Sequence, residues 1–123
     1  FTIAIVEDNP INRNTFLQKT KQMQEVKLVF MATNGNDCLE ELKGLPLQLL
    51  PQVIFMDLEM PEMDGYTLTA EIRSNPELKG LHVILHTSLS GVFNHAMVQK
   101  VGADNFIAKF HPDELAKAVQ DAM

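Results

Sequence analysis

Five polar residues could together carry out phosphoryl chemistry if the fold gathers them at one place. Three are carboxylates, Glu7, Asp8 and Asp57, and the other two are Thr87 and Lys109. Carboxylates held within about 4–6 Å repel one another by roughly 3 kcal/mol per pair, and a divalent cation relieves that repulsion. An all-oxygen, partly hydrated site suits Mg²⁺. Lys109 and Thr87 offer a positive charge and a hydroxyl to phosphoryl oxygens, so the central carboxylate, Asp57, would be the nucleophile.

Short apolar runs that predict strands precede each of these residues. We expect strands at 2–6, 26–32, 53–56, 81–86 and 105–108 and helices at about 10–23, from the 34–37 turn to 43, at 66–74, at 92–101 and from 112. In an open α/β sheet the carboxyl ends of the strands line one crevice. Taken alone, Asp57 could equally cap the helix that follows it. The convergence of five residues on one sheet edge favours chemistry.

The alternation of strands and helices predicts the fold. Five strand-helix units in 123 residues imply a parallel sheet with helices on both faces, because each crossover must be right-handed. We therefore expect an α/β, flavodoxin-like (βα)5 doubly wound sandwich, with a five-stranded parallel sheet in the order 2-1-3-4-5.

Composition limits the class of protein. With 123 residues, 46% of them hydrophobic, residues 1–123 fit a single domain. A net charge of −6 with scattered Lys and Arg argues against nucleic-acid binding and against an anionic membrane surface. One cysteine forms no internal disulfide and no apolar run could span a membrane, so we expect a cytoplasmic protein without membrane insertion. The first residue, Phe1, leads almost at once into a strand, which suggests a domain excised from a longer protein.

Several apolar and titratable residues have structural interpretations. His82 and His86 alternate with apolar residues, so we interpret them as satisfied, partly buried histidines rather than ligands. Cys38 has no evident base and is interpreted as a packing residue. The leucines of 44–51 are expected in the core, and the first helix is expected to bury Ile11, Phe16, Thr20 and Met23.

Four motifs resemble one family. These are the Glu7-Asp8 pair, the MDLEMPEMDG run at 56–65, Thr87 followed by a small residue, and Lys109 on the fifth strand. As a set they are similar to a response-regulator receiver domain over essentially all 123 residues. The resemblance implies a two-component phosphorelay, in which a histidine kinase passes a phosphoryl group to the receiver.

The resemblance also implies a role for each site residue. Asp57 would be the phosphoacceptor, and Asp8 and Asp57 would bind Mg²⁺. Glu7 would assist through water, and Glu59 would lend its backbone carbonyl and modulate hydrolysis.

The remaining implied roles concern switching. Thr87 would be the switch hydroxyl, Lys109 the phosphoryl-binding cation and Phe106 an aromatic rotamer switch, although Phe106 could also be a core residue. Ser88 replaces a commoner alanine and would tune the phosphoryl lifetime. The readout would be the face formed by the fourth helix, fifth strand and fifth helix. Phe110 stands where the family usually has proline, so a cis peptide after Lys109 would cost roughly 3–4 kcal/mol.

The two halves resemble different receivers. LHVILHTSLSGVFN and KVGADNFIAKFHPDEL look like receivers of CheV-type chemotaxis coupling proteins, which implies a chemoreceptor-kinase assembly reached through a coupling domain. IAIVEDNPINR and ATNGNDCLEEL look more like receivers of DNA-binding regulators or hybrid kinases. A mosaic chain and ordinary divergence both explain the difference.

Two rival classes share part of the pattern. An aspartate-nucleophile phosphatase would use a strand-end Asp with Mg²⁺, but the chain has no insertion that could form its cap. A non-phosphorylated docking module would not need the acidic set. We therefore expect a signalling phosphoacceptor that promotes only its own phosphoryl transfer and dephosphorylation, and not an enzyme with a separate substrate.

Overall fold

Strand β3 (Val53–Asp57) is buried at every position and lies in the middle of a parallel sheet. The computed structural model describes residues 2–23, 26–58, 60, 63–86, 95–107 and 117. The strands run in the order β2-β1-β3-β4-β5, and their bounds are β1 (Thr2–Val6), β2 (Lys27–Ala32), β3 (Val53–Asp57), β4 (His82–His86) and β5 (Asn105–Ile107).

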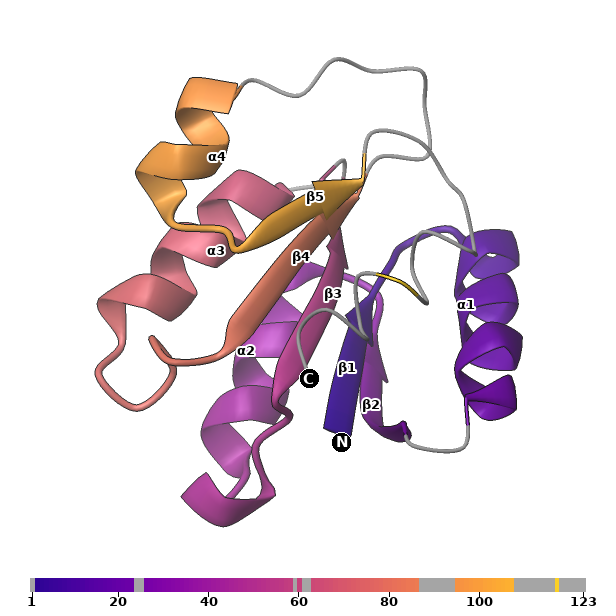
Figure 1. Cartoon of the computed structure of the whole chain (residues 1–123). Helices are drawn as coiled ribbons and strands as arrows, with labels where there is room; N and C mark the ends of the chain where they lie inside the picture. Colours follow the sequence, from indigo (N-terminus) through magenta and orange to yellow (C-terminus); the bar gives the residue numbers. More distant parts are fainter. Residues whose placement is uncertain are drawn as a thin grey trace.

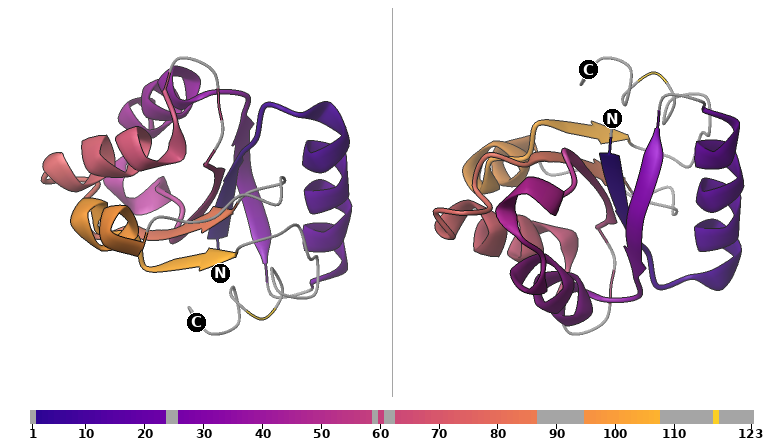
Figure 2. Two further views of the ribbon diagram at one scale, coloured as in Figure 1. Left: turned by 90° about the horizontal axis from the view of Figure 1, so that it is seen from above. Right: turned by 90° about the horizontal axis from the view of Figure 1, so that it is seen from below.

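Helices cover both faces of this sheet (Figures 1 and 2). Among the described helices, α1 lies on one face and α2, α3 and α4 lie on the other. Their bounds are α1 (Pro10–Gln22), α2 (Gly35–Gly44), the 3-10 turn η1 (Leu47–Leu49), α3 (Gly65–Ser74) and α4 (His95–Val101). The predicted flavodoxin-like α/β class is confirmed, while the helix expected from about 112 lies outside the described residues.

Alternation along the strands divides the core into two clusters, one on each face. The cluster on the α1 face consists of Ile3, Ile5, Phe16, Val53, Phe55 and Ile84. The intervening strand residues Ala4, Val6, Ile54, Met56, Val83 and Leu85 belong to the cluster that also contains Leu42 of α2 and Leu68 and Ile72 of α3. Glu7, Asp57 and His86 continue the alternation of the first cluster, which assigns them to the α1 face.

Side-chain caps fix where the helices begin. Asn9 Oδ1 accepts hydrogen bonds from the backbone N–H groups of Ile11 and Asn12, and Asp64 Oδ1 accepts from Thr67. These bonds satisfy N–H groups that a helix leaves without partners. Because Asn9 and Asp64 directly precede α1 and α3, the caps also hold the turns next to the strand ends.

Two predictions about buried apolar residues are wrong. Ile11 is 75% exposed, because it lies in the first turn of a helix whose apolar residues do not form a clear stripe. Leu47 and Leu49 are also exposed, because the η1 turn between Pro46 and Leu50 directs them to solvent. Phe16, Thr20 and Cys38 are buried as predicted, with Leu42, Leu68 and Ile72.

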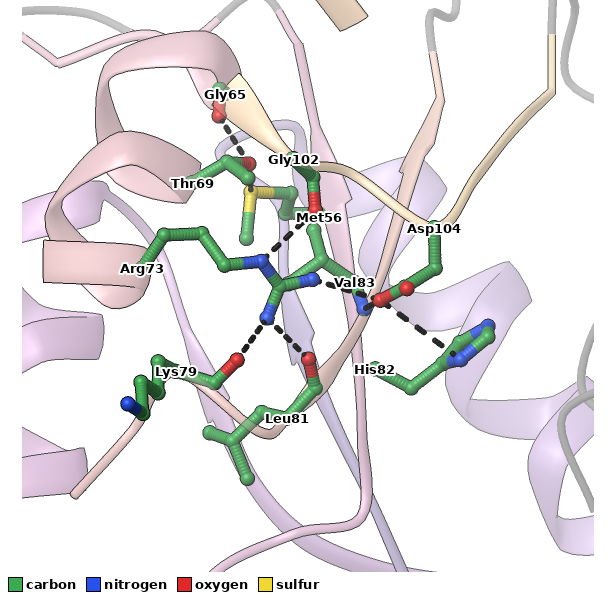
Figure 3. Close-up of polar contacts among 10 residues, drawn as sticks. All are labelled: Met56, Gly65, Thr69, Arg73, Lys79, Leu81, His82, Val83, Gly102 and Asp104. Carbon is green, nitrogen blue, oxygen red and sulfur yellow. Dashed lines mark hydrogen bonds and ion pairs between the residues drawn. The ribbon is translucent and has the colours of Figure 1, made fainter. Parts of the chain in front are cut away.

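A polar cluster ties α3 to the amino-terminal ends of β4 and β5 (Figure 3). The guanidinium of Arg73 donates to the carbonyls of Gly102, Lys79 and Leu81 and to the carboxylate of Asp104. Asp104 Oδ2 also accepts from the backbone N–H of Val83 at 2.8 Å. Gly102, which follows α4 and has a φ of +81°, is therefore held by α3.

Candidate functional site

Three strand ends meet at the carboxyl edge of the sheet. Glu7 follows β1, Asp57 ends β3 and His86 ends β4, and Asp57 pairs in register with His86. One donor atom from each side chain lies within 4.8 Å of the donors of the other two, and all three side chains are buried. The predicted meeting of Glu7 with Asp57 is observed, whereas His86 was not predicted there.

The carboxylate of Glu7 is held in one orientation. Oε1 accepts from the backbone N–H of Asn9 at 3.4 Å and from Nδ2 of Asn12 at 3.2 Å. The residue is 0% exposed, and its Oε2 lies 3.0 Å from Nε2 of His86. The start of α1 thus fixes one carboxylate oxygen and leaves the other facing the strand ends.

Asp8 lies in the turn between β1 and α1. Its side chain is half-buried and is not part of the compact group that Glu7, Asp57 and His86 form. The guanidinium of Arg13 donates to the backbone carbonyls of Glu7 and Asp8, at 3.1 and 3.0 Å. Arg13 therefore holds this turn through its backbone.

The backbone around Asp57 is held from two sides. The N–H of Leu58 donates to the carbonyl of His86 at 2.7 Å, and the N–H of Gly65 donates to the carbonyl of Leu58 at 2.9 Å. A Cβ on Gly65 would lie 2.8 Å from the carbonyl oxygen of Asp57 and 2.9 Å from a methyl group of Leu85. Only glycine lets the start of α3 approach the phosphoacceptor candidate this closely.

His86 is packed between two phenyl rings. Its imidazole stacks on Phe55 with ring centroids 4.5 Å apart and meets Phe16 edge-on at 4.9 Å. The side chain is 1% exposed, and neither ring nitrogen makes a hydrogen bond within the described structure. The interpretation of His86 as a satisfied, partly buried histidine is therefore wrong.

The other histidine of β4 fits its interpretation better. His82 is a third exposed, and its Nδ1 lies 3.8 Å from the carboxylate of Asp104. His82 and His86 differ because they lie at opposite ends of the same strand. The position of His86 directly before Thr87, in phase with buried Ile84, is the sequence signal that could have revealed it.

The remaining predicted site residues are not tested by the structure. Glu59, Thr87, Ser88 and Lys109 lie outside the described residues, as does the peptide between Lys109 and Phe110. Phe106 belongs to β5 and pairs with Leu85 of β4, but its side chain also lies outside the description.

Cys38 has no place in this site. Burial, with a smaller contribution from the charge of Glu41, raises the pKa of the Cys38 thiol to about 12. A thiol with this pKa stays protonated at neutral pH and is a poor nucleophile. Its interpretation as a packing residue agrees with its complete burial in α2.

Fold and site together define a flavodoxin-like α/β domain with buried acidic residues at the carboxyl edge of its sheet. Residues 3–120 match the family model described as "Response regulator receiver domain". The chain belongs to this family.

Relatives include chemotaxis and kinase-linked receivers. Chemotaxis protein CheV1 of Helicobacter pylori is 32% identical over 120 residues, which is 96% of this chain and 36% of CheV1. The signal receiver domain of a signal transduction histidine kinase from Syntrophus aciditrophicus is 30% identical, with a TM-score of 0.82 over 98% of this chain and 88% of that one. The chain spans less than two thirds of the length of the first curated relatives it matches.

A more distant solved structure shares the fold. The receiver domain of sensor histidine kinase PA1611 from Pseudomonas aeruginosa, described with a magnesium ion coordinated in its active site cleft, is 23% identical with a TM-score of 0.81 over 98% of this chain and 94% of that one. At this identity the likeness establishes the common fold.

Among the described helices of the present chain, none has the length and apolar character to cross a membrane.

Proposed function

We propose that this receiver accepts a phosphoryl group from a histidine kinase onto Asp57. The observation that carries the proposal is the burial of Asp57, 2% exposed, within 4.8 Å of the Glu7 carboxylate at the one edge where parallel strands present their carboxyl ends. Two carboxylates in so small a buried space repel each other unless a cation joins them.

A divalent cation fits the donor set. Asp8 and Asp57 would bind Mg²⁺ directly, Glu7 would act through water and Glu59 would offer its backbone carbonyl. The ion would neutralise charge that develops on the phosphoryl oxygens. Glu7 supports this assignment, because Asn9 and Asn12 bind only its Oε1 and leave Oε2 facing the strand ends, 3.0 Å from Nε2 of His86.

The transfer itself needs one nucleophile and few other groups. A carboxylate oxygen of Asp57 attacks phosphorus while the bond from phosphorus to the donor, a kinase imidazole nitrogen or the acetate oxygen of acetyl phosphate, breaks with its electron pair. Lys109 would hold the transferred oxygens by charge. Such catalysis is mostly positioning and electrostatics, which agrees with a signalling domain that acts on itself alone.

Phosphorylation would be transmitted by Thr87 and Phe106. Movement of the Thr87 hydroxyl toward the phosphoryl group would vacate space for the ring of Phe106, a two-state packing change. Ser88 and Glu59 would modulate how long the state lasts. Partners would read the change on the surface formed by α4, β5 and the last helix.

Chemotaxis is the pathway class we favour, with residues 1–123 as one cytoplasmic receiver domain of a larger protein. The 32% identity to CheV1 across almost the entire chain supports it, and the partners would be a histidine kinase within a chemoreceptor assembly. A second candidate is the receiver of a hybrid kinase, which the 30% identity to the Syntrophus receiver favours.

Chemical phosphorylation tests the proposal. With Mg²⁺ and acetyl phosphate, intact-mass spectrometry is expected to show one added phosphoryl group that hydroxylamine removes and EDTA prevents. The Asp57→Asn variant should stay unmodified. If the variant gained the group to the same extent as the unaltered chain, Asp57 would not be the acceptor.

A further inference from the structure

The imidazole of His86 is the one feature of the acidic cluster for which the proposed function gives no role. Its side chain is 1% exposed, and Nε2 lies in the same 4.8 Å group as the carboxylates of Glu7 and Asp57. A nitrogen donor among oxygen donors changes which ions a site prefers. A buried polar side chain directed at two carboxylates requires an explanation of its own.

Hydrogen bonding does not supply that explanation. Nε2 of His86 is 3.0 Å from Oε2 of Glu7, yet neither atom has hydrogen-bond geometry with any group in the described structure. A protonated imidazole placed beside a carboxylate would direct its N–H along the line between them. The atoms are close without that alignment.

A shared ion accounts for the same distance. Two donors that bind a first-row metal at about 2.1 Å and lie at right angles are about 3.0 Å apart. The separation of Nε2 from Oε2 is 3.0 Å. This spacing is compatible with two neighbouring ligands of one ion, and a carboxylate oxygen of Asp57 lies within 4.8 Å of both atoms.

The packing of His86 orients a nitrogen toward that point. Phe55 stacks on the ring with an interplanar angle of 5°, and Phe16 meets it at 68°. Both contacts restrict rotation of the imidazole and keep its Nε2 edge toward Glu7. On the other side, Asn12 and Asn9 hold Oε1 of Glu7, so the second donor is also fixed before an ion arrives.

We propose that His86 is a nitrogen ligand of the divalent cation, together with Glu7 and Asp57. The site would then bind first-row transition cations such as Mn²⁺ and Zn²⁺ in preference to Mg²⁺, because imidazole favours those metals over magnesium. This inference rests on the proposed phosphoacceptor site and changes which ion that site holds. It also gives Glu7 a direct bond to the ion rather than a bond through water.

Pulsed EPR of the Mn²⁺-loaded chain tests the proposal directly. The electron spin echo should be modulated by ¹⁴N of a coordinated imidazole. His86→Leu should lose this modulation, whereas His82→Leu, a matched change at the far end of β4, should keep it. Two results in the unaltered chain would overturn the proposal: Mn²⁺ that binds without ¹⁴N modulation, and the absence of Mn²⁺ binding. Either result would leave His86 and Glu7 as a histidine–carboxylate pair. The unaltered chain decides the question even if His86→Leu does not fold.

Competition between metals gives a second readout. Relative to the unaltered chain, His86→Leu should weaken Zn²⁺ binding at least about tenfold and change Mg²⁺ binding less than about threefold. Equal losses for both ions would contradict a nitrogen ligand.

Acetyl phosphate with Mg²⁺ separates this inference from the proposed function. Phosphorylation of Asp57 without ¹⁴N modulation defeats only the inference, and modulation without phosphorylation defeats only the proposed function.

Discussion

The guanidinium of Arg73 lies 2.7 Å from the carboxylate of Asp104, at the ends of β4 and β5 opposite to the acidic site. Asp104 is itself bonded to the backbone of β4, and Arg73 also binds the carbonyl that follows α4. One side chain of α3 thus joins the start of two strands to the end of another helix. In the proposed function partners read a surface that includes α4 and β5, and Arg73 binds the segment that joins these two elements.

Replacing Arg73 should destabilise the domain more than an ordinary surface change. Arg73→Lys should lower the free energy of unfolding by about 1–3 kcal/mol, because an ammonium cannot serve three carbonyls and a carboxylate at once. The ion pair itself contributes little of this, since the Asp104 side chain is 38% exposed. Urea unfolding measures the change. Lys100→Ala, a change of an exposed residue on α4, should alter the free energy of unfolding by less than about 0.5 kcal/mol. Equal effects of the two variants would show that the cluster is unimportant.

A methyl group on Gly65 should disturb both stability and phosphorylation. Its Cβ would lie 2.8 Å from the Asp57 carbonyl oxygen, so the start of α3 must move. Gly65→Ala should cost about 1–3 kcal/mol and slow the reaction with acetyl phosphate. Gly44→Ala is the control, because a Cβ there meets nothing within 4 Å, and it should be neutral or stabilising by up to about 1 kcal/mol. Unimpaired phosphorylation of Gly65→Ala would refute the need for this close approach.

The Cys38 thiol should make stability fall at alkaline pH. Folding raises its pKa from 9.0 to about 12, so the unfolded chain releases the proton first as pH increases. The stability that the protonated, buried thiol contributes is fully present below pH 9.0 and is lost between pH 9.0 and about 12. In that range the free energy of unfolding should fall by up to about 1.4 kcal/mol per pH unit. Comparing urea unfolding of the unaltered chain with Cys38→Ala from pH 8 to 10 isolates this slope. Identical slopes would contradict a buried thiol with a raised pKa.

Asp8 should control the response of stability to Mg²⁺. The ion should raise the melting temperature of the unaltered chain, because it binds only the folded state. In Asp8→Ala that rise should vanish, although loss of a like charge could raise the melting temperature without metal. Glu40→Ala, an exposed acid on α2, should respond as the unaltered chain does. A normal Mg²⁺ response in Asp8→Ala would remove Asp8 from the site.

The sheet and its acidic edge could be predicted because they follow from strong local patterns. Apolar runs such as 53–56 have few alternatives to a buried parallel strand, and acids at their ends must meet if the strands are parallel. Ile11 and Leu49 could not be placed, because apolar character does not decide which side of a short polar helix or turn faces the core. His86 was misinterpreted for a related reason. Alternation places it on a face, but only tertiary packing brings Phe16 and Glu7 to that face.

Mapping the phosphorylated residue tests the central claim most directly. After reaction with acetyl phosphate and Mg²⁺, borohydride reduction converts an aspartyl phosphate to homoserine, which peptide mass spectrometry can locate. We expect homoserine at position 57 in the unaltered chain and in Asp64→Asn, a neighbouring acid that caps α3, and none in Asp57→Asn. The account would be contradicted if homoserine were found at another position. It would also be contradicted if position 57 were still aspartate after borohydride treatment of a chain that carries the phosphoryl group.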